Sequence, residues 1–96
     1  MTTSMRVLDH APQAWWLLGD GERRFLDVRC SGVLADYSLL LELTDGEQRR
    51  IAQAGHAGCA ALAARVQADP QAHVSRDVTA DNGAAVLAAV LAWRDG

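Results

Sequence analysis

The chain has 96 residues, half of them apolar, and its 9 basic and 12 acidic residues give a net charge of −3. This length and composition suffice for one modest core, so we expect a single α+β domain over residues 1–96. The acidic balance, without a cluster of positive charge, argues against nucleic acid or an anionic membrane as a partner. In so short a chain, a homodimer would be a natural way to cover leftover apolar surface.

The residue types also exclude some chemistry. All nine basic residues are arginine. Without lysine the chain has neither a P-loop lysine nor a lysine for Schiff-base catalysis. No segment resembles a signal peptide or a membrane span, so we expect a soluble, cytoplasmic protein. In a reducing compartment Cys30 and Cys59 are expected to be free, buried thiols.

The first elements are predicted to be strands. Residues 1–10 are expected to be a short strand at 6–8 or a loose N-terminal arm. Two β-favouring runs, 14–18 and 23–30, flank the turn signal Gly19-Asp20-Gly21 and predict a β-hairpin. After a loop, residues 37–43 predict a third strand.

Alternation along the second and third strands divides the predicted sheet into two faces, because side chains alternate with a period of two. The face expected to lie on the core contains Leu26, Val28, Cys30, Tyr37, Leu39, Leu41 and Leu43. The other, outer face is mixed and contains Phe25, Asp27, Arg29, Ser38, Leu40 and Glu42. The sheet should therefore need covering on at least one side.

Helices are predicted after the strands. Thr44 and Glu47 have the spacing of a capping box, which begins a helix that should run to about residue 68. Gly55 and Gly58 inside this helix suggest that another backbone passes close by, most often the sheet or the second helix.

The last third of the chain is less regular. Weak alternation over 72–78 leaves a fourth, edge strand open, and Thr79 or Asp81 is expected to cap a final helix. The predicted architecture is α+β in the order β-β-β-α-(β)-α. It has a three- or four-stranded, mainly antiparallel sheet with two helices on one face.

No metal or thiol site is predicted. His56 and Cys59 are three residues apart on the first predicted helix, but two ligands do not make a zinc site and the other donors lack paired spacings. Cys30 as a nucleophile would need a neighbouring histidine that the sequence does not locate.

The outer face also carries residue types that are used in acid and base chemistry. Asp27, Arg29 and Glu42 could form a polar pocket there, but charge pairing across a solvated sheet explains the same pattern. The sequence therefore predicts no catalytic residue, no cofactor and no metal.

The outer face is the strongest candidate for an interaction surface. Phe25 and Leu40 are predicted to point away from the core, and adjacency forces either Trp15 or Trp16 outward as well. The alternative is that the N-terminal arm or the last helix covers these residues and makes a two-sided core. The predicted protein-binding residues are Trp16, Phe25, Asp27, Arg29, Leu40 and Glu42.

Two functions follow from this sequence. The first is a small bacterial-type, non-enzymatic protein-binding module of the inhibitor, immunity or adaptor type, which is an association at the level of the fold. The alternative is a homo-oligomeric small-molecule-binding protein or enzyme with a cleft between subunits. That cleft would draw on Asp27, Arg29, Tyr37 and His56.

Overall fold

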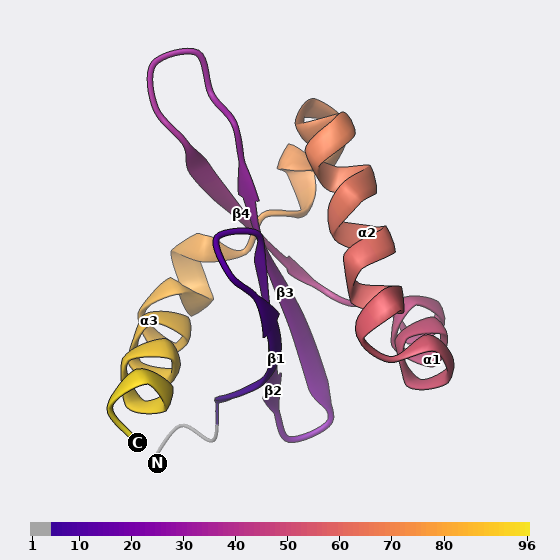
Figure 1. Ribbon diagram of the computed structural model, residues 1–96, viewed down its shortest axis with the longest axis vertical. Coiled ribbons are helices and arrows are strands. Elements are labelled where there is room, and N and C mark those ends of the chain that lie inside the picture. Colours follow the sequence, from indigo (N-terminus) through magenta and orange to yellow (C-terminus); the bar gives the residue numbers. More distant parts are fainter. Residues whose placement is uncertain (1–4) are drawn as a thin grey trace.

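A four-stranded antiparallel sheet forms the centre of the protein (Figure 1). The structure is a computed structural model and describes residues 5–96. The sheet has the order β1-β2-β3-β4, with strands β1 (Arg6–Ala11), β2 (Trp15–Asp20), β3 (Arg23–Cys30) and β4 (Tyr37–Glu42). The remaining elements are α1 (Asp45–Ala54), α2 (His56–Ala68), the 3-10 helix η1 (Pro70–Arg76) and α3 (Thr79–Asp95). The predicted α+β class and the order of strands and helices are confirmed.

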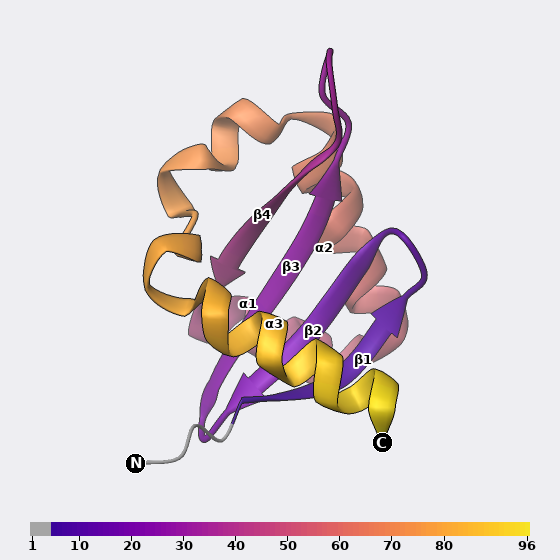
Figure 2. The ribbon, with the colours of Figure 1, turned by 90° about the vertical axis from the view of Figure 1, so that its left-hand side faces the viewer.

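The predicted hairpin is β2 and β3. Asp20 pairs with Arg23 at its tip, and Gly21 has a φ of +62°, a left-handed conformation that glycine adopts without strain. A longer loop, residues 31–36, joins β3 to β4 and projects beyond the rest of the molecule (Figure 2). The two ends of β3 therefore differ, since one is a tight turn and the other an extended loop.

Helices α1 and α2 lie on the face that the sequence assigned to the core (Figure 1). Alternate residues of β2, β3 and β4 meet α2 there, as the alternation predicted. Tyr37, the first residue of β4, was predicted on this face as well, but it is exposed and lies outside the core. The buried residues of this core are Trp15, Leu17, Leu26, Val28, Cys30, Leu39, Leu41, Leu43, Cys59, Leu62, Ala63 and Val66. Both cysteines are free and buried, which confirms that prediction.

Helix α3 lies on the opposite, outer face, which differs from the expectation that both helices would share one side. Phe25 is 0% exposed and Leu40 is 2% exposed beneath it. The second core contains Met5, Leu18, Phe25, Leu40, Val86 and Ala89. An apolar face in water is unfavourable, so both sides of this sheet require a helix.

The predicted first helix is divided into α1 and α2. Its capping box is present, because the Glu47 amide donates to Thr44 Oγ1 at 3.2 Å and the Thr44 amide donates to Glu47 Oε1 at 2.9 Å. Gly55 ends α1 with a φ of +65° and is not a helix-interior residue. A Cβ on Gly58 would lie 3.2 Å from Ile51 Cα, so the close backbone is α1 itself.

The segment before α3 is not the predicted edge strand. Residues 70–76 form η1. The segment 72–78 contacts the sheet through one isolated antiparallel bridge, between Asp77 and Leu41 of β4. The Asp77 carboxylate accepts hydrogen bonds from the Leu40 amide at 3.0 Å and the Thr79 amide at 3.2 Å. Asp77 therefore supports the start of α3 and takes the place of the predicted caps Thr79 and Asp81.

The fourth strand is β1, in the segment predicted as a short strand or a loose arm. Residues 1–4 of that segment lie outside the described residues. The pairing of β1 with β2 shifts register between Val7 and Asp9. None of the helices within residues 5–96 combines the length and the apolarity needed to cross a bilayer.

We expect Phe25→Ala to unfold the outer core. Removing a fully buried phenylalanine side chain costs about 3–5 kcal/mol, because contacts are lost and a cavity remains. Urea denaturation of this variant should show that loss, while Arg29→Ala, at an exposed position, should stay within about 0.5 kcal/mol of the parent. An unchanged midpoint for Phe25→Ala would mean that α3 does not cover this face.

Candidate functional site

Helix α3 covers only part of the outer face. In Figure 2 it crosses the sheet near the hairpin end, and β3 and β4 continue beyond it toward the 31–36 loop. At the border of this cover lies a row of three paired residues, Trp16 on β2, Asp27 on β3 and Leu40 on β4, of which Leu40 is buried against α3. Directly paired residues on antiparallel strands project from the same face, so the sheet register brings these side chains together.

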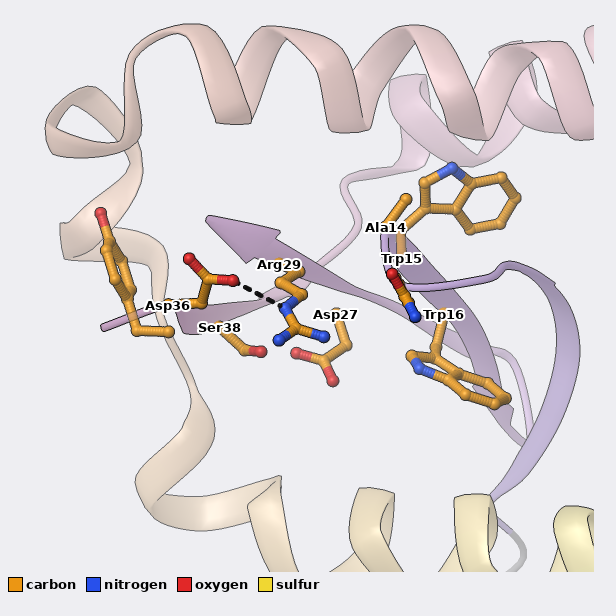
Figure 3. Close-up of a pocket in the computed structure, with 9 residues that line it drawn as sticks. Ala14, Trp15, Trp16, Asp27, Arg29, Asp36 and Ser38 are labelled. Atoms are coloured by element: carbon orange, nitrogen blue, oxygen red, sulfur yellow. Dashed lines mark ion pairs between the residues drawn. The ribbon is translucent and has the colours of Figure 1, made fainter. Parts of the chain in front are cut away.

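Two hollows adjoin at this row. The loop hollow has a volume of about 240 Å³, and its lining includes Trp16, Asp27, Arg29, Asp36, Tyr37 and Ser38 (Figure 3). The helix hollow has a volume of about 410 Å³, and its lining includes Trp16, Asp27, Leu40, Val86, Leu87 and Val90. Both hollows share Trp16, Asp27 and Ser38, so Asp27 is accessible from the loop side and from the helix side.

Asp27 is the unusual group of the site. Its side chain is half-buried, and no described residue makes a hydrogen bond or an ion pair with it. Burial, and secondarily the negative charge of Asp77, raises the pKa of Asp27 to about 6. A carboxyl group with a shifted pKa in a hollow is a typical signature of a functional site.

The nearest cation to Asp27 along the strand is engaged elsewhere. Arg29 Nε lies 3.4 Å from Asp36 Oδ2, and Figure 3 shows this ion pair beside the Asp27 carboxylate. Both partners are about half exposed, so the pair is weak and its geometry is easily changed. The site thus combines one unpaired carboxylate with one exposed ion pair.

Trp16 is fixed by an aromatic cluster. The His10 ring stacks on Trp16 at 4.9 Å between centroids, and Trp93 meets Trp16 edge-on at 5.3 Å. This cluster joins β1, β2 and the end of α3. The Trp16 ring, which lines both hollows, is therefore held in place by contacts from two other elements, β1 and α3.

The thiols are poorly suited to nucleophilic chemistry. Cys30 and Cys59 are 1% and 0% exposed. Burial raises the pKa of both thiols, to about 11 for Cys59, so their reactive thiolate is scarce at neutral pH. Among residues 5–96, no three His, Cys, Asp or Glu side chains group in a way that could hold a metal ion.

His56 lines neither hollow. Its Nδ1 is 2.9 Å from Asp9 Oδ2, and its ring is 4.9 Å from Trp15 on the α2 side of the sheet. Of the residues predicted for an inter-subunit cleft, Asp27, Arg29 and Tyr37 line the loop hollow within a single chain. His56 is not among them.

The six residues predicted for protein binding separate into three groups. Trp16, Asp27 and Arg29 line the loop hollow. Leu40 forms part of the helix hollow, but it is buried like Phe25, so the predicted exposure of these two residues is wrong. Glu42 is paired with Arg23 at 3.0 Å, and neither hollow is lined by it.

Sequence reasoning missed the residues beyond the strands. Asp36 lines the loop hollow and Leu87 lines the helix hollow. Val33 and Leu34 are fully exposed in the loop between β3 and β4. The sequence did contain a signal for this surface. Loops usually carry polar residues, and this loop, which contains Ser31-Gly32 and Asp36, also contains two large apolar residues.

No protein-family model, curated protein or solved structure is significantly similar to this chain. The roles of these residues therefore follow from their own geometry and chemistry.

We expect Asp27→Asn to stabilise the protein at neutral pH. The folded protein keeps the Asp27 proton up to a pKa of about 6, whereas the unfolded chain releases it near 4, so wild-type stability falls across that interval. The Asp27→Asn variant does not lose stability in this way, because asparagine does not ionise. Because the carboxylate still contacts solvent through the hollows, we expect a gain of roughly 1–2 kcal/mol above about pH 7 and little gain near pH 3.5.

Thermal unfolding over this pH range measures the effect, and Asp36→Asn is the matched control. It removes an exposed carboxylate from the same hollow and should change stability by less than about 0.5 kcal/mol. Lower stability of Asp27→Asn at neutral pH would mean that the Asp27 carboxylate has a hydrogen-bond donor in the folded protein.

Proposed function

We propose that this protein is a non-enzymatic protein-binding module that holds its partner at the open end of the outer face. The observation that carries the proposal is the full exposure of Val33 and Leu34, side by side in the 31–36 loop. Neither residue belongs to either hydrophobic core. Their apolar surface contributes nothing to folding and remains available for a partner.

The energetic argument favours a protein as the partner. Burying a valine or leucine side chain is worth about 1.5–3 kcal/mol, so two adjacent residues offer a substantial part of a binding free energy. Single exposed leucines are common and need no explanation. Here the two residues stand on a projecting loop, and Tyr37 at the loop's end is partly exposed as well.

The hollows supply the polar part of such an interface. Protein interfaces combine a central apolar or aromatic contact with a few placed charged groups. Trp16 and Leu87 offer apolar contact, and Asp27 with the Arg29–Asp36 pair offers charge. The inhibitor, immunity or adaptor type remains the class that we associate with this architecture.

A second candidate is the binding of a small molecule in the hollows. The observation that favours it is that Asp27, Arg29 and Tyr37 line one hollow within a single chain, beside a second hollow of about 410 Å³. Hollows of roughly 300–1,000 Å³ are typical of ligand sites. Binding of a small molecule inside the hollows of one chain would not depend on Val33 or Leu34, because neither residue lines a hollow.

The test is affinity capture from lysate of the source organism with the tagged protein and two variants. The double variant Val33→Ser/Leu34→Ser removes the exposed apolar pair, and we expect partner binding to fall at least about tenfold. Val74→Ser is the matched control, because Val74 is also an exposed apolar residue but lies on η1, outside the 31–36 loop. Both variants should keep wild-type stability within about 0.5 kcal/mol.

Affinities are then measured by calorimetry with the purified partner. Equal binding by the loop variant and wild type would contradict the proposal. If no stoichiometric partner is captured and light scattering shows a discrete homo-oligomer, the result would contradict the protein-binding proposal and favour the second candidate, the binding of a small molecule in the hollows.

A further inference from the structure

The Asp27 carboxylate lacks a counter-ion within the described part of the chain. Arg29, two residues from Asp27 on β3, pairs with Asp36. Two other arginines are paired as well, Arg23 with Glu42 at 3.0 Å and Arg76 with Glu47 at 2.7 Å. An ionised carboxylate that is half-buried without a partner is unfavourable, because it has lost hydration without gaining a compensating contact. The nearby charge of Asp77 adds to the negative potential at this position.

The walls around this carboxylate are apolar. Trp16, Leu40, Val86, Leu87 and Val90 line the helix hollow, and its polar side chains are Asp27, Ser38 and Thr79. A chain of methylene groups that ends in a positive charge matches this distribution, since the stem contacts apolar surface while the charged end meets the carboxylate. The Trp16 ring beside Asp27 offers a second favourable contact for a cation (Figure 3).

A bare metal ion fits this site less well. Calcium and magnesium take six or more oxygen ligands, usually from several carboxylates and carbonyl groups. Asp27 is the one carboxylate that lines both hollows among the residues that the structure describes. The match is therefore to an organic cation with an apolar stem.

We infer that the helix hollow receives a lysine or arginine side chain of the partner protein, with Asp27 as its counter-ion. This inference rests on the proposed protein-binding function and names the chemistry by which the partner is recognised. The Val33–Leu34 pair supplies apolar contact at the loop, and Asp27 selects for a positive charge at the sheet. An acidic chain of net charge −3 is suited to such a partner.

The first test uses small probes and needs no partner. N-acetylarginine amide and N-acetyllysine amide are titrated into the full chain, with N-acetylcitrulline amide as the uncharged analogue. Binding is followed through the Trp16 indole N–H and the Ser38 amide in nitrogen–proton NMR spectra. We expect at least one charged probe to give saturable shifts in roughly the millimolar range, and at least about tenfold weaker binding of citrulline amide.

Asp27→Asn and Arg29→Gln complete the test. The first should weaken binding of the charged probe at least about tenfold. The second removes the nearest positive charge along β3 and should tighten binding of the charged probe, because the Arg29 guanidinium repels a cation in the hollow. Equal binding of citrulline amide, equal binding by Asp27→Asn, or no binding of either charged probe to wild type would overturn the inference.

The captured partner separates failure of this inference from failure of the proposed function. A partner that is lost by the loop double variant but retained in full by Asp27→Asn would overturn the inference and leave the proposed function standing. A different result is that the charged probe binds wild type while the partner binds the loop double variant and wild type equally. That result would overturn both the proposed function and this inference, and it would assign the hollow to a free organic cation.

Discussion

Burial of both faces of the sheet is the constraint from which the other features follow. Phe25 and Leu26 are neighbours on β3, point to opposite faces and are each 0% exposed. A sheet with two apolar faces must be covered twice, so α2 packs on one side and α3 on the other. Helix α3 does not extend over the loop end of the sheet (Figure 2). The helix hollow lies between α3 and the sheet, and the loop hollow adjoins it toward the 31–36 loop.

This arrangement explains why the Asp27 carboxylate is half-buried and unpaired. It occupies an outer-face position in a row with Trp16 and Leu40, where an apolar residue would fit the surrounding packing. The carboxylate lowers the stability of the fold at neutral pH, because burial disfavours its charge. Structural carboxylates in partly buried positions are normally paired. A carboxylate kept without a partner, at the junction of two hollows, is more readily explained by a ligand that supplies the missing charge.

Much of the fold followed from local signals in the sequence. The hairpin, the capping box and the alternation of Leu26, Val28 and Cys30 each depend on residues close together in the chain.

Other features of the fold depend on contacts between residues far apart in the chain. Alternation showed that Phe25 and Leu40 share the outer face, but only the packing of α3 decides whether that face is exposed. The register shift between Val7 and Asp9 interrupts the alternation of β1, which made that strand hard to recognise. Asp27 and Arg29 were identified as candidates, whereas the exposed Val33–Leu34 pair was overlooked because neither residue belongs to the alternating pattern of a strand.

The most direct test of this account is the titration of the Asp27 side-chain carboxyl carbon by carbon-13 NMR in the isolated protein. An unpaired, half-buried carboxylate beside Asp77 should titrate with an apparent pKa of about 6. A value near or below about 4, the range of an exposed or paired aspartate, would contradict it. That result would mean that Asp27 is either exposed to solvent or already paired within the chain, so that the hollow holds no unpaired, buried carboxylate for a cation to bind.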